Sequence, residues 1–290
     1  MFGVSSMTAT LKKVAVKKPG KSLINAKAEK WHYGPLFDPK KIEEDHANFV
    51  QRLKHTGTEI FWMPEDDLGI ADSVFTYDAS LMTPFGAILM FPGKLLRRGE
   101  QNIHRSFYEN LNIPIIGSVG NGGLAEAGDT LWLDEKTLII GRGFRTNPKG
   151  IEQIKNILKP QDITIRIFDL PAYSGASACL HLMSLISLVD THSALVCLPL
   201  LPVGLLELLK EKHFSLIEAP FQEFAESNTL STNVLATSPG EVIMLDSAPK
   251  SRAALESVGI RVQVFNGDSL CIGCEGGPTC LTRPLLRAHK

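Results

Sequence analysis

One cysteine and one histidine have the surroundings of a nucleophile and its acid–base partner. Cys280 follows a Gly-Gly-Pro-Thr segment, and glycines permit the tight turn that can hold a thiol at the edge of a cavity. His181 is flanked by leucines, so its ring is expected to be buried or to face a cavity. Taken singly, each could be an ordinary core residue. Together they predict covalent catalysis by a thiolate, with the histidine as acid and base.

Four acidic residues stand where a carboxylate needs a partner. Glu126 and Asp129 lie three residues apart before an apolar strand, where one could orient His181 and the other could bind a cationic substrate. Asp72 and Asp78 bracket an apolar segment, and an acid at the end of such a segment is costly to bury unless it is paired. For Glu126 and Asp129 the alternative is a solvated loop. The acid at the end of the 72–78 segment is expected to have a cationic partner.

These residues recur at a regular interval along the chain. A single polar residue heads each of five apolar strands, at Asp78, Asp129, His181, Asn233 and Cys280, with spacings of 51, 52, 52 and 47 residues. If equivalent modules form a ring, equivalent strand ends point at one centre and the five side chains meet there. Each residue alone could be an ordinary strand end. Five in phase predict a central active site.

The elements that must position these residues repeat in the same order. In each copy two short apolar strands joined by a turn precede an amphipathic helix and a closing strand. The expected elements cover residues 78–91, 100–111 and 114–116; 130–133, 137–141, 148–158 and 163–168; 182–188, 194–198, 203–212 and 215–218; and 234–237, 241–245, 251–257 and 261–265. This repeat predicts an α/β fold built from ββαβ modules.

Composition narrows the class of protein. The chain has 290 residues, 44% of them apolar, and can bury a large core. Its 31 acidic and 30 basic residues nearly cancel, which argues against binding to nucleic acid or to an anionic membrane. The most apolar stretch, 194–209, contains two prolines and is shorter than the roughly 20 residues that cross a bilayer. Without a secretion-signal pattern, we expect a cytoplasmic protein that binds a small molecule, with a homodimer as an open possibility.

The N-terminus and the other cysteines suggest no chemistry. Residues 1–13 are expected to form a flexible tail, followed by one catalytic domain over residues 14–290. Five cysteines, an odd number in a chain without a secretion signal, indicate reduced thiols. Cys271 and Cys274 have the spacing of zinc and redox sites, but no second such pair follows. We therefore expect neither a metal nor an organic cofactor.

Six segments, in this order, resemble motifs of the pentein superfamily, and within it the bacterial dimethylarginine dimethylaminohydrolases and arginine deiminases. The resemblance covers roughly residues 14–286. Residues 75–78 (Phe-Thr-Tyr-Asp) are similar to the family's Phe-x-x-Asp motif, 97–100 (Arg-Arg-Gly-Glu) to Arg-Arg-x-Glu, 126–129 (Glu-Ala-Gly-Asp) to Glu-Gly-Gly-Asp, 145–147 to Arg-Thr-Asn and 181–182 to His-Leu, and Cys280 occupies the C-terminal cysteine position.

The resemblance implies a five-fold pseudo-symmetric α/β propeller around a central cavity, and it implies roles. Asp78 would bind a guanidinium, Arg98 and Arg145 a substrate carboxylate, and Glu126 would orient the histidine. The candidate catalytic residues are therefore Cys280, His181 and Glu126, and the candidate substrate-binding residues are Asp72, Asp78, Asp129, Arg98 and Arg145.

Three departures from the family pattern bear on the substrate. Ala127 replaces a glycine, Tyr77 stands where dimethylarginine hydrolases have Glu, and Met183 stands where arginine deiminases have a second substrate-binding Asp. A flexible apolar side chain at position 183 suits alkyl groups on the guanidine. We therefore expect a substituted guanidine to be a better substrate than arginine itself.

The expected reaction is hydrolysis of a guanidine or amidine C–N bond. The thiolate of Cys280 would attack the guanidine carbon, His181 would protonate the departing amine or ammonia, and water would hydrolyse the thiouronium intermediate. An amidinotransferase would pass the amidino group from the same intermediate to an amine. A catalytically silent protein would only hold a cationic ligand in the cavity, although it would have no use for all three catalytic residues.

Overall fold

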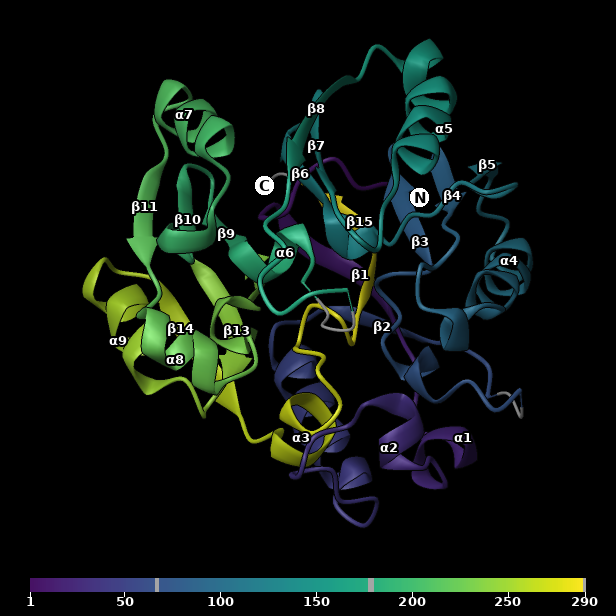
Figure 1. Cartoon of the computed structure of the whole chain (residues 1–290), viewed down its shortest axis with the longest axis vertical. Coiled ribbons are helices and arrows are strands. Elements are labelled where there is room, and N and C mark those ends of the chain that lie inside the picture. The colour runs from purple at the N-terminus through teal and green to yellow at the C-terminus, as the bar shows by residue number, and fades with distance from the viewer. Residues whose placement is uncertain (66–67, 177–179, 289–290) are drawn as a thin grey trace.

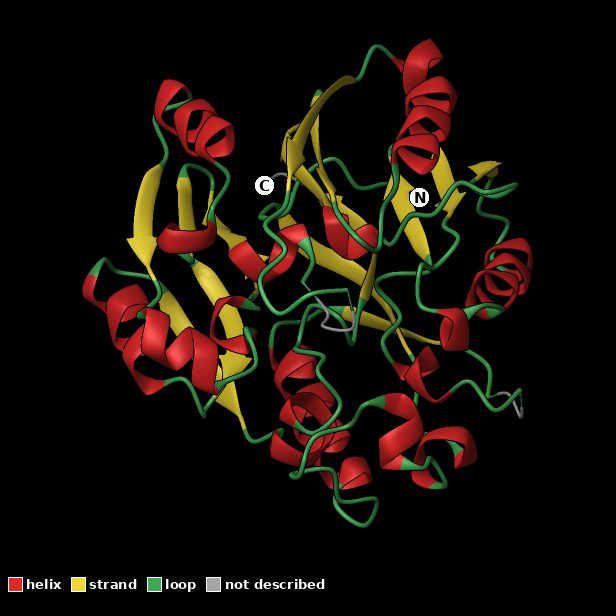
Figure 2. Cartoon of the chain, viewed as in Figure 1, coloured by secondary structure: helices red, strands yellow, loops and turns green. Residues whose placement is uncertain are grey.

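The computed structural model describes residues 1–65, 68–176 and 180–288. Within these ranges fifteen strands form five three-stranded sheets, which surround a common centre (Figure 1). In each sheet the middle strand is antiparallel to one neighbour and parallel to the other. Figure 2 shows the strands toward the inside and the longer helices around the outside. The predicted α/β propeller of ββαβ modules is confirmed.

Each module has two antiparallel strands, a crossover helix and a closing strand; in four modules the two antiparallel strands form a hairpin, and in the fifth they come from opposite ends of the chain. In chain order the modules are β3 (Ser80–Thr83), β4 (Gly86–Leu89), α4 (Glu100–Asn110) and β5 (Ile115–Ser118); β6 (Thr130–Asp134), β7 (Thr137–Arg142), α5 (Pro148–Leu158) and β8 (Thr164–Asp169); β9 (Ile186–Asp190), β10 (Ser193–Val196), α7 (Val203–Glu211) and β11 (Ser215–Glu218); β12 (Leu235–Ser238), β13 (Glu241–Leu245), α9 (Pro249–Ser257) and β14 (Arg261–Phe265); and β15 (Arg283–Ala288), β1 (Thr10–Val16), α3 (Ile42–His55) and β2 (Glu59–Trp62).

The crossover helices form for local reasons that the sequence carries. Parallel strands need a long connection, usually a helix. In α5, Asn147 caps the first turn by accepting a hydrogen bond from the backbone N–H of Gly150 at 2.8 Å, and Pro148 occupies the first helical position. Ile151 and Ile154 then lie on the buried face. None of the helices that the structure describes is both long enough and apolar enough to cross a membrane.

The fifth module is completed by both ends of the chain, which corrects the expectation of a flexible tail over residues 1–13. Strand β1 begins at Thr10 and is the middle strand of its sheet, between β15 and β2. The N–H of Gly3 donates to the carbonyl of Leu285 at 2.8 Å, and Val4 and Ala9 are buried. This segment pairs with the other end of the chain, so no local sequence pattern could predict that it is ordered.

The third module begins differently from the prediction. A strand was expected over residues 182–188, but a one-turn helix, α6 (Leu182–Leu185), precedes β9. The turn is held by Asp129, whose Oδ1 accepts the N–H of Leu182 at 3.0 Å. The remaining short helices, α1 (Lys21–Ile24), α2 (Ala28–Trp31) and α8 (Phe221–Glu226), lie outside the repeat.

Candidate active site

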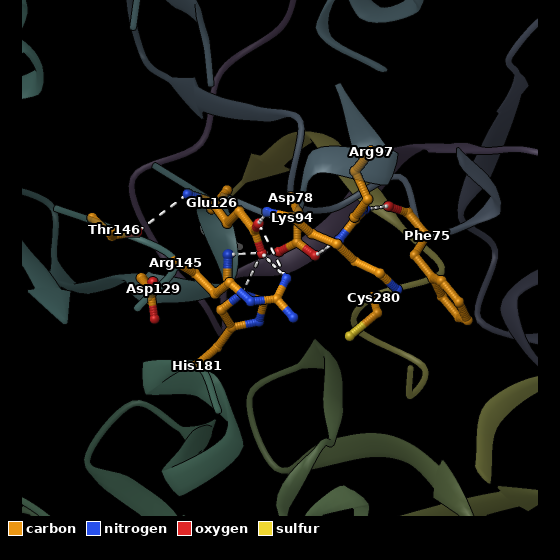
Figure 3. Close-up of polar contacts among 12 residues, drawn as sticks. Phe75, Asp78, Lys94, Arg97, Glu126, Asp129, Arg145, Thr146, His181 and Cys280 are labelled. Atoms are coloured by element: carbon orange, nitrogen blue, oxygen red, sulfur yellow. Dashed lines mark hydrogen bonds and ion pairs between the residues drawn. The ribbon is translucent and has the colours of Figure 1, made fainter. Parts of the chain in front are cut away.

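A cavity of about 470 Å³ lies at the centre of the ring. Four of the five module heads line it, namely Asp78, His181, Asn233 and Cys280. The fifth, Asp129, does not, and its neighbour Gly128 lines the wall in its place. The predicted convergence of strand ends therefore holds for four of the five modules; Figure 3 shows three of these heads, Asp78, His181 and Cys280.

Glu126 and His181 form the most buried pair of the site. The imidazole Nε2 lies 2.7 Å from Oε2 of Glu126, which is fully buried. Burial alone would raise the pKa of Glu126, but the Arg145 guanidinium, 3.2 Å away, and the histidine hydrogen bond outweigh it and hold that pKa below its usual range. Because an ionised carboxylate only accepts hydrogen bonds, Nε2 carries the proton and Nδ1 is the nitrogen that can exchange one.

Close packing behind His181 requires a glycine. A Cβ on Gly128 would lie 2.6 Å from Nδ1 of His181 and 2.8 Å from Oδ1 of Asp78. The second glycine of the Glu-Gly-Gly-Asp pattern therefore has a steric role here. The first is Ala127, which is fully buried and adopts ordinary backbone angles.

Asp78 is neutralised within the protein. Its Oδ2 lies 2.5 Å from Nη1 of Arg97, and its Oδ1 accepts the N–H of Gly128 at 2.9 Å. Arg97 also makes a two-pronged contact with Glu100, 2.8 Å on each side, and donates to the carbonyl of Phe75. Burial disfavours the charge of Arg97, but Glu100 and Asp78 outweigh it and hold the pKa of Arg97 above its usual value.

Asp72 lies farther along the same wall. Its Oδ1 accepts the hydroxyl of Tyr33 and its Oδ2 lies next to Nζ of Lys94, both at 2.7 Å. Lys94 also donates to the carbonyl of Trp31 at 3.1 Å and lies over the Trp31 ring. Burial, together with the Asp72 carboxylate, raises the pKa of Tyr33, so the phenol keeps its proton. Asp72 thus faces the cavity as part of a buried polar cluster.

Cys280 is half-buried and faces the cavity from the fifth module. Its Sγ lies 3.2 Å from Nδ2 of Asn233, and its carbonyl accepts the N–H of Tyr77 at 3.1 Å. Figure 3 shows the sulfur pointing into the space that His181, Arg145 and Asp78 enclose from the other side. A nucleophile, an imidazole on a carboxylate and a second carboxylate thus face one volume, as thiol-based covalent catalysis requires.

A model of the family described as N,N dimethylarginine dimethylhydrolase, eukaryotic, matches residues 23–268. The chain belongs to this family. It is 26% identical to the N(G),N(G)-dimethylarginine dimethylaminohydrolase of Pseudomonas aeruginosa over 273 residues, which span 93% of this chain and 98% of the relative. The predicted membership of the pentein superfamily, and the predicted class of enzyme, a hydrolase of amidine or guanidine C–N bonds, are confirmed.

Two solved structures support the fold. A mutant of the Pseudomonas aeruginosa dimethylarginine dimethylaminohydrolase complexed with citrulline superposes with a TM-score of 0.77 at 24% identity, over 96% of this chain and 100% of that one. An amidinotransferase from Microseira wollei, of the saxitoxin biosynthetic pathway, gives 0.80 at 16% identity, over 100% and 98%. At these identities the likeness concerns the fold alone.

The position of Arg98 in the structure does not fit its predicted role as a ligand of the substrate carboxylate. Arg98 is exposed and lies over the ring of Phe91, 5.1 Å from its centroid, outside the residues that line the cavity. The 3₁₀ turn Leu95–Arg97 instead directs the preceding arginine inward, where it is buried against Asp78. Arg145 does line the cavity, beside Glu126.

Asp129 differs from its predicted role as a substrate ligand. It is fully buried, and its Oδ1 accepts the N–H of Leu182 in the turn below His181. Burial raises the pKa of Asp129 to about 6. Two residues that line the cavity, Lys94 and Asn233, were not assigned a role from the sequence, although Asn233 was marked by its phase in the repeat. Tyr33, which donates to Asp72, was not assigned one either.

Cys274 of the Cys-x-x-Cys pair also lines the cavity, but neither thiol of the pair is ionised. Burial raises the pKa of both thiols, so Cys271 and Cys274 are protonated near neutral pH. Among the described residues, the one group with metal-ligand spacing is Asp78, Glu126 and His181, whose nearest atoms lie within 4.8 Å of one another. Arg97 and Arg145 already neutralise its two carboxylates, so a metal cation there would have to compete with two guanidinium groups.

Proposed function

We propose that this enzyme hydrolyses a C–N bond of a substituted, arginine-like guanidine through a covalent intermediate on Cys280. The observation that carries the proposal is that Cys280 and His181, the latter bonded to a buried carboxylate, line one cavity together with Asp72 and Asp78. A volume of about 470 Å³ is in the range of small-molecule sites. Acids on one wall and a thiol on the other suit a planar cation whose central carbon is attacked.

Asp72 and Asp78 could bind the guanidinium because the protein leaves some of their hydrogen-bond acceptor sites free. Each carboxylate oxygen of Asp78 and Asp72 accepts one hydrogen bond from the chain, and each has a further lone pair. Arg145 would meet a carboxylate of the substrate, and Lys94 and Arg97 are further cationic side chains that line the cavity. Arg97 is occupied by Asp78 and Glu100 and would serve to fix Asp78.

The first half of the reaction would expel the amine. The thiolate of Cys280 attacks the guanidine carbon and forms a C–S bond, giving a tetrahedral adduct. Protonated His181 gives its proton to the nitrogen of the departing amine, and the C–N bond breaks to leave an S-alkylthiouronium on the cysteine. Ionised Glu126 stabilises the imidazolium before this transfer, which is the reason that its low pKa matters.

The second half would return the enzyme to its starting state. Neutral His181 takes a proton from water as the oxygen attacks the thiouronium carbon, and the C–S bond then breaks to release the thiolate. The product is a ureido compound, citrulline where the substrate is an arginine. His181 is again protonated and Cys280 again ionised. The hydroxyl proton of the second tetrahedral adduct passes through solvent to the released amine, which becomes an ammonium ion, so protons and charge balance over the cycle.

The test is a panel of guanidines with two readouts. Arginine, N-methylated arginines and shorter guanidino acids are incubated with the protein, and both released amine and ureido product are measured. Quenched samples are examined by peptide mass spectrometry for an adduct on Cys280, with Cys280→Ser as the control. Turnover that survives in Cys280→Ser, or neither product nor adduct with any compound, overturns the proposal. Product that forms only when an acceptor amine is added would identify a transferase.

A further inference from the structure

Asn233 is held in one orientation beside the nucleophile. It lies at the head of the fourth module, is 6% exposed and lines the cavity. Its Oδ1 accepts the backbone N–H of Thr279 at 3.0 Å, and its Nδ2 lies 3.2 Å from Sγ of Cys280. Because a backbone N–H can only donate, the amide oxygen must face Thr279. The amide NH₂ group therefore faces the sulfur.

The loop that carries Cys280 packs directly against the side chain of Asn233. A Cβ on Gly277 would lie 2.5 Å from both Cγ and Oδ1 of Asn233, so only glycine permits this approach. The hydroxyl of Thr279 also donates to the carbonyl of Val234 at 3.2 Å. The amide thus has two separable functions: its oxygen anchors the loop, and its nitrogen contacts the reacting atom.

We propose that Asn233 is a catalytic residue that donates Nδ2–H to the Cys280 thiolate and lowers the pKa of the thiol. The proposal rests on the proposed function, since it concerns the same nucleophile. A hydrogen bond to the charged form of a titrating group favours that form, and bonds to ionised acceptors are stronger than those to neutral ones. The same donor stabilises the sulfur as the leaving group when the thiouronium is hydrolysed.

The sharpest test keeps the hydrogen bond between position 233 and the N–H of Thr279 and removes the N–H donor that faces Cys280. Asn233→Asp retains an oxygen for the N–H of Thr279 but places a carboxylate oxygen next to the sulfur, whereas Asn233→Ala removes both contacts. Thr279→Val is the matched control, because it loosens the same loop through its hydroxyl and leaves the backbone N–H and the sulfur contact in place. Alkylation by iodoacetamide is measured against pH at the Cys280 peptide by mass spectrometry. Folding of each variant is checked by circular dichroism.

We expect the midpoint of the alkylation profile to rise by about one pH unit or more in Asn233→Asp. At pH values below the midpoint this corresponds to a roughly tenfold slower reaction. Asn233→Ala should shift in the same direction by less, since no carboxylate replaces the donor, and Thr279→Val should keep the wild-type midpoint. A folded Asn233→Asp or Asn233→Ala with the wild-type midpoint overturns the proposal, as does an equal shift in Thr279→Val.

The outcome separates this inference from the proposed function. A shifted midpoint in a protein that turns over no guanidine would leave the role of Asn233 intact and remove the hydrolase. If wild type turns over a guanidine through a Cys280 adduct but the Asn233 variants keep the wild-type midpoint, the proposed function stands and the role of Asn233 is removed. If Asn233→Asp does not fold, Asn233→Ala against Thr279→Val decides the question.

Discussion

Asp129 should destabilise the folded protein in a pH-dependent manner when it is ionised. Burial raises its pKa to about 6, from about 3.8 for an exposed aspartate, so the folded state binds a proton more tightly than the unfolded state does. For an acid shifted in this direction, the stability contribution is fully present below the unfolded pKa and is lost as the pH rises through the folded pKa. A shift of about two units at 1.36 kcal/mol each amounts to about 3 kcal/mol.

Asparagine at position 129 removes the ionisation and keeps an oxygen for the N–H of Leu182. We expect Asp129→Asn to gain about 3 kcal/mol of folding stability relative to wild type as the pH rises from 4 to 8. For a chain of this length that is a difference in Tm of about 5 °C, at an unfolding entropy of roughly 2 cal/mol/K per residue. Taking the difference at two pH values cancels any constant cost of burying the amide.

The assay is thermal unfolding of both proteins across this pH range. Asp169→Asn is the matched control, because Asp169 is exposed and its hydrogen bond to Arg142 lowers its pKa. Its difference from wild type should be small and of opposite sign. A difference for Asp129→Asn that does not change with pH would refute the reasoning. Since Asp129 lies outside the cavity lining, the variant should also keep the wild-type KM, and a large rise in KM would restore the role of substrate ligand.

Three further predictions concern the chemistry. Cys280→Ser should abolish turnover and keep the fold, while Cys274→Ser should keep turnover, because burial raises the pKa of the Cys274 thiol; steady-state rates and circular dichroism decide this. His181→Ala should lower kcat by about 10²–10⁴-fold and Glu126→Gln by less, since the carboxylate acts through the ring; equal, wild-type-like rates would remove the histidine from the mechanism. Wild type should prefer N-methylated arginines, and Met183→Asp should move the ratio of kcat/KM values toward arginine by tenfold or more; a wild-type preference for arginine would contradict the interpretation of Met183.

The module order could be predicted from sequence because its causes are local. Helix α5 was predicted over 148–158 and β14 over 261–265, and both have those bounds. A capping Asn before a Pro and a helical apolar period lie within or directly beside the segment of α5, and alternation of polar and apolar residues lies within that of β14. Pairing of Gly3 with the end of the chain was missed because its partner lies more than 280 residues away.

Side-chain direction in the site could not be predicted in the same way. Arg97 and Arg98 are adjacent and chemically identical, and a 3₁₀ turn decides which of them enters the wall. The family pattern names the pair of residues but not their directions. Lys94 carries no sequence signal of its own, because its place beside Asp72 follows from the same turn.

The phase of the five module heads has a structural cause as well as a chemical one. Oδ1 of Asp78 accepts the N–H of Gly128, just before the head of the second module. Oδ1 of Asp129 accepts the N–H of Leu182, just after the head of the third. The heads therefore join neighbouring modules by hydrogen bonds of about 3 Å from side chain to backbone.

Hydrogen bonds also join the fourth module to the fifth and the fifth module to the first, so regular spacing alone does not distinguish structural heads from substrate ligands. Oδ1 of Asn233 accepts the N–H of Thr279 in the fifth module, and the carbonyl of Cys280 accepts the N–H of Tyr77 in the first. At Asp78, Asp129 and Asn233 a polar side chain therefore joins neighbouring modules, whether or not it also performs chemistry, whereas Cys280 does so through its backbone carbonyl. Regular spacing therefore identifies residues that join modules by hydrogen bonds. Of their polar atoms, only those that still face the cavity can contact a substrate. Asp129 has none, whereas Asn233 presents its amide nitrogen to the sulfur.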